Sequence, residues 1–593
     1  NLILSVLSKY NIADGLDFNL ITGTTTLDSE REVFFPKTTR LGSLWDSRAI
    51  YNTSNARNYT VEPYLSYNKN FNAHNIGVTA GYTWITDVQK RLNTLVTEFP
   101  VDLLATDNVG LGLNPFIPSS SKIKRTLSSY YARFNYNYDQ KYYISLTGRA
   151  DGSSVFAENK KWGYFPSVGV GWTVSNEAFL KESNTLSNLK LRASYGVTGS
   201  QSIAPLQSLT LLGAANAVYG DVLFSGLAPV RLGNPDLEWE KTSQLNVGLD
   251  FGFLQDRFFA SLDYYEKTTD DLLLNFPLPT SAGLGSITAN AGSIENSGFE
   301  VVVGGYIIDS KNFKWNTNFN WSNNKTTVVN LGEGDADIFG PGPATNIVNQ
   351  PSNVMRVGEQ FSALFGYNVT GVLQESDFDA DGNALVPVLG VSFPGIYKYE
   401  DISGPDGVPD GVINGSDRTI IGNPNPDYIF GWNNDFQYKN FSLSVFVQGS
   451  VGNDLMNINN LFLSSGRSNN NAFQEWFDNR WSPENPTNNP RYIDGSRGTE
   501  LNQYLQPNSA IVEDGSYIRL KNVSLGYNIP MVNIKGISSV RVYATATNLI
   551  TITDYSGFDP EVNIRGGNNL AQGIDFAAYP RAQTYTLGLN IGL

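Results

Sequence analysis

Two acidic runs have the residue types and spacing of a calcium-binding loop. In the first run, Asp377, Asp379 and Asp381 stand at alternate positions, and Gly382 follows them. Alternate carboxylates supply oxygen ligands from one side of a turning chain, and a glycine at the sixth position allows the sharp bend. The twelfth position, where an acid usually closes the loop, holds Val388. The first run therefore predicts a weak Ca²⁺ site whose ligand set is incomplete.

The second acidic run matches the same pattern at different positions. It places carboxylates at positions 1, 5 and 12, which are Asp406, Asp410 and Asp417. Gly411 occupies position 6, but position 3 holds Val408. For both runs the alternative is a set of ordinary turns, in which Asp side chains bind nearby backbone groups. Ca²⁺, bound in an extracellular loop, is the one cofactor that the sequence predicts.

Tryptophans in polar stretches form a second group that could bind a ligand. Trp239, Trp476 and Trp481 lie in such stretches. An indole ring can stack on a sugar ring or pack against a partner protein, because it combines a large apolar surface with one polar N–H group. The alternative is that these rings form small hydrophobic cores within the loops themselves.

The sequence contains no recognisable catalytic site. It has no cysteine, and its single histidine, His74, lies beside an expected turn. No nucleophile elbow, phosphate-binding loop or zinc-binding helix is present. The formal charge of 41 − 56 = −15 argues against a nucleic-acid-binding surface. We therefore expect no enzyme and no nucleic-acid partner.

The elements that carry these residues are predicted to be strands. Apolar and polar residues alternate in many segments, for example in Val523–Ile529 and in Val540–Thr547. Successive side chains of a strand point to opposite faces, so each such segment has one apolar and one polar face. The predicted strands are 2–12, 16–27, 58–69, 75–88, 127–138, 142–150, 163–175, 188–198, 242–254, 258–268, 298–308, 313–324, 430–438, 441–449, 517–529, 539–548 and 583–593. These are eight pairs and one single strand, or 17 in total.

The connections distinguish a membrane barrel from a soluble sandwich. Very short turns such as Asp139–Lys141 and Lys439–Asn440 join some neighbouring strands, and three longer links, near 70–74, 176–187 and 531–538, continue the series. Between these hairpins, the connections 28–57, 199–240, 325–429 and 450–516 are long and polar. Short turns on one side and long loops on the other are typical of outer-membrane barrels. No run reaches the roughly 18 apolar residues of a membrane helix. The sequence therefore predicts an all-β, transmembrane antiparallel β-barrel in the outer membrane.

Several blocks resemble one family, the SusC/RagA-like TonB-dependent transporters. The matching blocks, spread through essentially the whole chain, are Arg149–Ser154, Lys161–Ser167, Leu189–Gly199, Asp263–Tyr265, Asp270–Leu273, Asn296–Glu300, Asp417–Pro424 and Tyr517–Tyr527. The resemblance implies a 22-stranded barrel, in which the 17 strands would be strands 6–22. It also implies TonB-driven import of oligosaccharides or peptides, a SusD-like surface lipoprotein as a lid, and a dimer of such pairs.

The chain departs from this family because residues 1–593 contain no plug and no TonB box. An odd strand count would leave an unpaired edge in lipid, where unsatisfied backbone groups are costly. We therefore expect 1–593 to be the barrel, with an N-terminal portion of the same protein outside this sequence. Leu593 also departs from the usual terminal aromatic residue, which suggests further chain. The alternative function is a plugless pore or a structural barrel in a larger envelope or secretion assembly.

Overall fold

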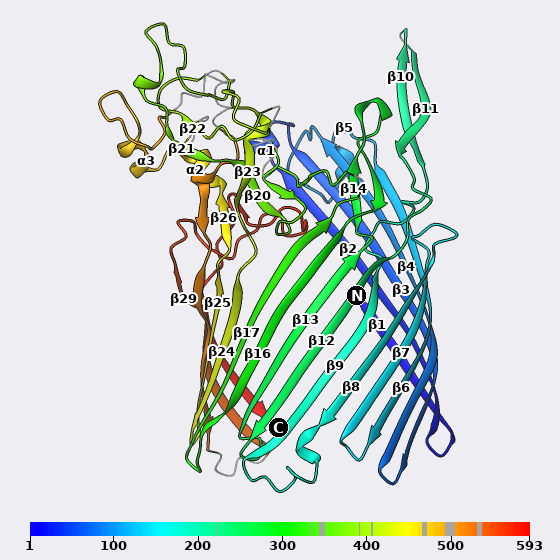
Figure 1. Cartoon of the computed structure of the whole chain (residues 1–593). Helices are drawn as coiled ribbons and strands as arrows, with labels where there is room; N and C mark the ends of the chain where they lie inside the picture. Colours follow the sequence, from blue (N-terminus) through cyan, green and yellow to red (C-terminus); the bar gives the residue numbers. More distant parts are fainter. Residues whose placement is uncertain are drawn as a thin grey trace. The chain divides into compact units, whose positions relative to one another are not determined.

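The computed structural model describes residues 1–592 except 221, 333, 343–349, 391, 405–406, 465–470, 493–504 and 531–535. Its secondary structure is almost entirely β (Figure 1). The chain divides into two compact units. Unit 1 consists of residues 1–176, 192–245 and 269–291, and unit 2 consists of 177–191, 246–268 and 292–593. Within the described residues, no helix is both long and apolar enough to cross a membrane.

The number of long strands agrees with the sequence. Within the described residues, 18 strands belong to one large sheet. One of them, β5 (Asn114–Pro115), has only 2 residues, so 18 − 1 = 17 long strands remain. The 17 strands expected from alternation are thus confirmed, and each expected range overlaps an observed strand.

Unit 1 contains a ladder of consecutive antiparallel strands. In order they are β1 (Leu2–Ala13), β2 (Leu16–Phe35), β3 (Arg48–Phe71), β4 (His74–Thr97), β6 (Ser119–Tyr138), β7 (Tyr142–Ser153) and β8 (Trp162–Thr173). Three further long strands have residues in both units: β9 (Leu186–Ser200), β12 (Glu240–Phe253) and β13 (Phe258–Asp270).

Unit 2 contains a second ladder of the same kind. In order its strands are β16 (Ser293–Asp309), β17 (Phe313–Asn330), β24 (Tyr428–Tyr438), β25 (Phe441–Val451), β28 (Tyr517–Ile529), β29 (Ser539–Thr553) and β31 (Thr584–Gly592). Every pairing between successive members is antiparallel.

Tight turns separate the members of most expected pairs, whereas residues 174–185 separate β8 from β9 and residues 530–538 separate β28 from β29. Gly15, between β1 and β2, has φ +79°, and a Cβ there would lie 2.4 Å from the carbonyl oxygen of Asn68. Only glycine fits at that position. Asp139 and Gln140, between β6 and β7, both have positive φ, as in the primed turns that match the twist of a hairpin. Because the strands are antiparallel, the tight turns of each unit lie at one end of its ladder and the long connections at the other.

Some strands are longer than expected. The range 28–57 was predicted to be a connection, and this is wrong. Strands β2 and β3 pair from Leu16↔Tyr67 to Phe35↔Arg48, so the true connection is 36–47. At about 3.3 Å per residue, the 24 residues of β3 span roughly 80 Å. The added residues 28–32 and 52–57 are mostly polar, so these outer halves carry little alternation, and backbone pairing with the neighbouring strands holds them in the ladder.

The long connections of unit 2 are folded and share a hydrophobic core, which differs from the polar loops expected from the sequence. Buried residues from 331–427, 452–516 and 554–583 form this core, among them Leu364, Tyr397, Met456, Trp481 and Ile574. The elements of these connections are β18 (Ile338–Phe339), β19 (Asn353–Met355), β20 (Ala363–Tyr367), β21 (Val369–Val372), β22 (Tyr397–Tyr399), β23 (Arg418–Gly422), β26 (Asp454–Asn457), α2 (Ile458–Ser464), α3 (Gln474–Asn479), β27 (Val512–Asp514), β30 (Ile574–Asp575) and the 3-10 helices Glu375–Asp377, Gly415–Asp417 and Ser509–Ile511.

The connections of unit 1 contain smaller elements. They are α1 (Arg40–Ser43), the hairpin of β10 (Leu211–Tyr219) and β11 (Val222–Arg231), the hairpin of β14 (Leu273–Pro277) and β15 (Ser286–Asn290), and the 3-10 helices Val109–Leu111, Val174–Asn176 and Thr280–Ala282. Trp239 belongs to a separate buried cluster here, together with Val155, Phe156 and Phe165. In both units, buried apolar residues therefore gather mainly in the connections.

Candidate functional site

The ladder of unit 2 has one apolar and one polar face, which the strand register shows directly. One row across six strands is entirely apolar: Trp315, Phe436, Leu443, Leu525, Ala544 and Leu587. The adjacent row is entirely polar: Asn316, Asp435, Ser444, Ser524, Thr545 and Thr586. The apolar row is open, since Leu525 is 51% and Leu587 85% exposed. A surface of this size suits a hydrocarbon environment, whereas the polar row suits water.

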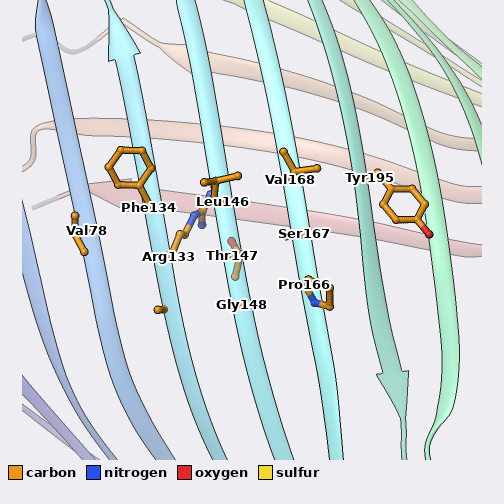
Figure 2. Close-up of a pocket in the computed structure, with 11 residues that line it drawn as sticks. Val78, Arg133, Phe134, Leu146, Thr147, Gly148, Pro166, Ser167, Val168 and Tyr195 are labelled. Atoms are coloured by element: carbon orange, nitrogen blue, oxygen red, sulfur yellow. The ribbon is translucent and has the colours of Figure 1, made fainter.

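The ladder of unit 1 repeats this division. Val78, Phe134, Leu146 and Val168 form an apolar row, and Thr79, Arg133, Thr147 and Ser167 form the polar row beside it. A hollow of about 540 Å³ borders the apolar row (Figure 2). Small residues make its floor, because Ala132, Gly148 and Pro166 are aligned across three strands. Apolar side chains dominate its lining. The hollow therefore suits a bulky hydrocarbon group, and its lining does not resemble a catalytic site.

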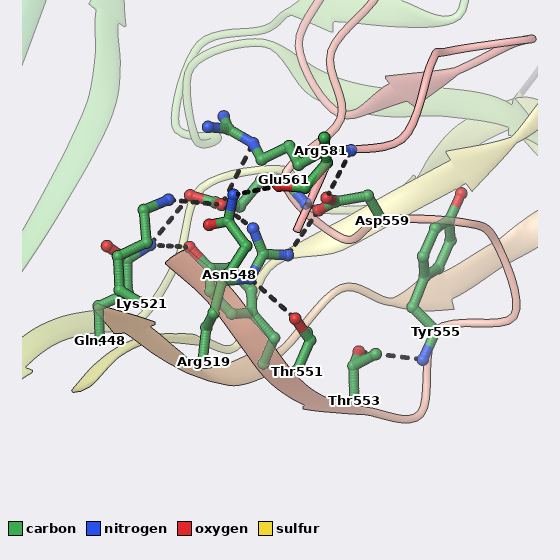
Figure 3. Close-up of polar contacts among 12 residues, drawn as sticks. Gln448, Arg519, Lys521, Asn548, Thr551, Thr553, Tyr555, Asp559, Glu561 and Arg581 are labelled. Atoms are coloured by element: carbon green, nitrogen blue, oxygen red, sulfur yellow. Dashed lines mark hydrogen bonds and ion pairs between the residues drawn. The ribbon is translucent and has the colours of Figure 1, made fainter. Parts of the chain in front are cut away.

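A buried cluster of charges ties the connection 554–583 to strand β28 (Figure 3). The Arg519 side chain is 1% exposed and donates to Asp559 Oδ1 at 2.7 Å and to Thr551 Oγ1 at 2.9 Å. It also forms an ion pair with Glu561. Lys521 Nζ lies 3.4 Å from the same glutamate. A buried arginine is stable only when paired in this way, so the cluster holds the connection, which follows strand β29 (Ser539–Thr553), against strand β28.

The cluster favours the charged forms of its two carboxyls. Burial by itself raises the pKa of Asp559, but hydrogen bonds from Arg519 and the Glu561 amide outweigh it, and the net pKa lies below its usual range. The pKa of Glu561 is likewise lowered: burial raises it, while the Tyr517 hydroxyl and the charge of Arg519 lower it by more. Sequence reasoning missed these residues. The sequence did contain one signal for this cluster: the charged residue Arg519 lies in a strand in which apolar and polar residues otherwise alternate.

The first acidic run forms a turn whose carboxylates bind nearby backbone. Asp379 Oδ1 accepts from the amides of Asp381 and Asn383, at 3.0 and 2.7 Å. Hydrogen bonds from the Asn383 side chain and backbone lower the pKa of Asp379. Asp377 accepts from the Gln374 amide at 2.9 Å and pairs with Lys398 at 3.2 Å. This is the pattern of an Asx turn and a helix cap.

The second acidic run is divided between local turns. Asp417 is fully buried and accepts from the amides of Ile402, Ser403 and Asn414. Asp410 accepts from the Val412 amide at 3.0 Å. Asp406 lies outside the described residues. Among the residues that the structure describes, no group of three or more His, Cys, Asp or Glu side chains is arranged to hold a metal ion. Calcium binding by either run stays a prediction.

The three tryptophans singled out from the sequence have different environments. Trp239 is 4% exposed, and its indole N–H donates to the Lys161 carbonyl oxygen at 2.8 Å. Trp481 is also 4% exposed, and it donates to Gln374 Oε1 at 2.8 Å. Both rings lie inside loop cores, which was the alternative reading. Trp476, on α3, is half-buried and lines a hollow of about 500 Å³. Ligand contact stays a prediction, and Trp476 alone of the three has an accessible ring.

The single histidine lies where the sequence placed it, beside a turn. His74 is exposed, and its Nδ1 lies 2.7 Å from the Tyr136 hydroxyl. Its ring packs against Tyr138, with the ring centres 4.9 Å apart. These contacts are structural. A general base would in addition need a reacting group within hydrogen-bond reach.

Comparison with known proteins gives one consistent family. Residues 7–549 match the family described as TonB dependent receptor-like, beta-barrel. TonB-dependent receptor P3 of Formosa agariphila is 37% identical over 590 residues, which cover 98% of this chain and 57% of that protein. TonB-dependent receptor SusC of Bacteroides thetaiotaomicron is 31% identical over 490 residues, which cover 79% of this chain and 46% of that protein. The chain thus spans about half the length of these relatives.

Solved structures share the fold. The RagAB peptide transporter has a TM-score of 0.81 and 24% sequence identity, over 99% of this chain and 61% of that chain. The family match covers most of the chain, and it includes the strands whose two faces are described above, except β31 and the end of β29. The chain therefore belongs to the TonB-dependent receptor-like β-barrel family of the outer membrane, a family of transporters rather than enzymes, and it is SusC/RagA-like.

Proposed function

We propose that this chain is the barrel of an outer-membrane importer that takes up oligosaccharides or peptides with energy supplied through TonB. The proposal rests on one observation: each ladder has an apolar row of side chains beside a polar row. In a barrel of this family, the apolar row faces lipid and the polar row lines the interior. Side chains such as Asn316, Asp435 and Ser524 then offer a polar solute many hydrogen-bonding groups along the wall.

The proposal includes a plug and a TonB box in the complete protein. An open barrel of this size would leak, whereas energy-dependent import needs a gate and a coupling segment. Neither pattern is found in residues 1–593, which span 57% of the Formosa relative. The sequence of the complete gene tests this part: an open reading frame that encodes no plug would contradict it and favour a pore or structural barrel.

The proposal also includes a SusD-like surface lipoprotein, and an exposed hairpin of unit 1 supports a partner. Strands β10 and β11 pair only with each other among the described residues, and Figure 1 shows them projecting from their unit. Their large apolar side chains are open to solvent: Val218 is 70%, Tyr219 83% and Leu227 72% exposed. A two-stranded hairpin is marginally stable alone, and exposed apolar patches mark interaction sites. A covering protein would stabilise it.

Uptake measurements in the source bacterium test the proposed function. We expect deletion of the gene to abolish uptake of at least one fluorescently labelled oligosaccharide or peptide. Deletion of TonB or addition of a protonophore should have the same effect, because import depends on the inner-membrane proton gradient. Uptake that continues unchanged without TonB and with a protonophore would refute active import and favour the open pore.

Co-purification tests the partner. An affinity tag on the complete protein should recover a surface lipoprotein, and the double substitution Tyr219→Ser and Leu227→Ser should reduce the recovered amount at least tenfold. Phe259→Ser, on an exposed site of strand β13, serves as the control and should leave recovery unchanged. Recovery that the hairpin variant does not alter would show that the hairpin has another role.

A further inference from the structure

The half-buried Trp476 lines a hollow built from two short helices and their flanking segments. The hollow has a volume of about 500 Å³, and its lining includes Trp476, Gln474 and Asn479 of α3, Asn460 of α2, and Asn489. This volume falls within the roughly 300–1,000 Å³ of small-molecule sites. All of these residues belong to unit 2. The hollow therefore forms within one unit of the fold.

The floor of the hollow is held in place by hydrogen bonds. Asn460 Nδ2 donates to Glu513 Oε1 at 2.8 Å, and the Ser556 hydroxyl donates to the same oxygen, also at 2.8 Å. On the other side, Asn489 Nδ2 donates to the Asn479 carbonyl oxygen at 3.3 Å. Asn460, Ser556 and Asn489 are thus positioned before any ligand arrives, and a pre-formed wall lowers the entropic cost of binding.

Three polar groups at the hollow have no partner among the described residues: the Trp476 indole N–H, the Glu475 carboxylate and the Asn479 side-chain amide. Together they provide donors, acceptors and one charged acceptor beside an aromatic ring. Lysine and arginine are absent from the described lining. A phosphate, sulfate or carboxylate would meet the charge of Glu475 without a compensating cation among these lining residues, so the described lining disfavours anions.

We infer that this hollow binds a neutral oligosaccharide, an inference that rests on the proposed import function and specifies its substrate class. One face of a pyranose ring carries C–H groups and is apolar, so it packs on the Trp476 ring. Its hydroxyls both donate and accept, which matches the amides of Gln474 and Asn479, and they can donate to Glu475. A peptide would instead need a strand edge for its backbone or charges for its ends, and the lining is helical or irregular.

Isothermal titration of the complete protein in detergent tests the inference. The probes are maltohexaose, cellohexaose, mannohexaose and xylohexaose, with hexagalacturonate and a mixture of hexapeptides as comparison ligands. We expect at least one neutral hexasaccharide to bind. Trp476→Ala should weaken that binding at least tenfold, and Trp476→Phe should retain part of it. Phe477→Ala is the matched control, because this neighbour on α3 is 47% exposed, stacks on Arg480 and does not line the hollow.

The outcomes separate this inference from the proposed function. Absence of binding by all four neutral hexasaccharides overturns the inference, as does binding that Trp476→Ala leaves unchanged. Binding of only the peptides or hexagalacturonate also overturns it. If Trp476→Ala instead releases a lipoprotein and no saccharide binds, the hollow is a protein contact. Titration needs neither TonB nor energy. Saccharide binding without cellular uptake would therefore contradict import and leave the binding site standing.

Discussion

Replacing Arg519 by methionine should release the connection 554–583 from the ladder of unit 2. The substitution keeps most of the side-chain volume but removes the cation between Asp559 and Glu561, both of which are largely buried. Removing one partner of a buried ion pair costs about 3–5 kcal/mol, because the other charge remains buried without compensation. At about 1.4 kcal/mol per factor of ten, local opening should become roughly 150-fold to 5,000-fold more frequent.

Hydrogen exchange followed by mass spectrometry measures this opening. The reporting amides are those that bind the Asp559 carboxylate, Glu561 N at 2.9 Å and Arg581 N at 3.3 Å. They should lose protection by that factor in Arg519→Met, while strands outside the cluster keep theirs. Lys521→Met is the matched control on the same strand. Its side chain is 27% exposed and 3.4 Å from Glu561, so its loss should cost less than about 1 kcal/mol.

A charge-neutralised variant separates orphaned charge from lost packing. Combining Arg519→Met with Asp559→Asn and Glu561→Gln leaves no buried carboxylate without its cation, and the two cations that lose Glu561, Lys521 and Arg581, are partly exposed. Protection should therefore recover by at least tenfold relative to Arg519→Met alone. Equal exchange in the wild type and in Arg519→Met would refute the reasoning. Equal exchange in the single and triple variants would show that packing, and not buried charge, holds the connection.

Four further predictions follow from the same observations. Since the pKa values of Asp559 and Glu561 are lowered in the folded state, the cluster should stabilise 554–583 above the ordinary carboxyl range, near pH 4. That stability should be lost as the pH falls through the lower folded values; protection that rises on acidification would contradict this. Leu146→Arg should destabilise the barrel by about 2–4 kcal/mol in urea unfolding from lipid vesicles, because it puts a charge in hydrocarbon. Thr147→Arg, on the opposite face, should cost little, and equal effects would invalidate the assignment of the faces. Trp481→Ala should cost about 3–5 kcal/mol by emptying a packed core, with increased exchange throughout the folded connections of unit 2. Calorimetric titration with Ca²⁺ should give heat of binding, and variants that lack the carboxylates of the two acidic runs should give none. An absence of heat in the wild type would mean that the two runs are ordinary turns.

The strands are the part of this protein that could be predicted from sequence most completely. Alternation has a period of two residues, and every residue of a strand contributes to it. The apolar faces are also required wherever a strand meets lipid. The limits of the strands were harder to predict. The outer halves of β2 and β3 are mostly polar and carry little alternation, and backbone pairing continues them.

The candidate site could be predicted only in part. Trp239, Trp476 and Trp481 look equivalent in the sequence, since each stands in a polar stretch. The fold buries two of them and leaves one beside a hollow, because their environments depend on packing between distant connections. Similarly, no local pattern joins Arg519 to Asp559 and Glu561, which are 40 and 42 residues away.

The sequence by itself determined the strand count, the tight turns and the two faces of each ladder, because these follow from local geometry and residue period. The tertiary structure alone decided that three long connections fold into one core, and that Arg519 anchors one of them to a strand. It also decided that Trp476 has an accessible ring whereas Trp481 does not. Such features arise from contacts between residues far apart in the chain, where burial and charge pairing depend on which surfaces meet.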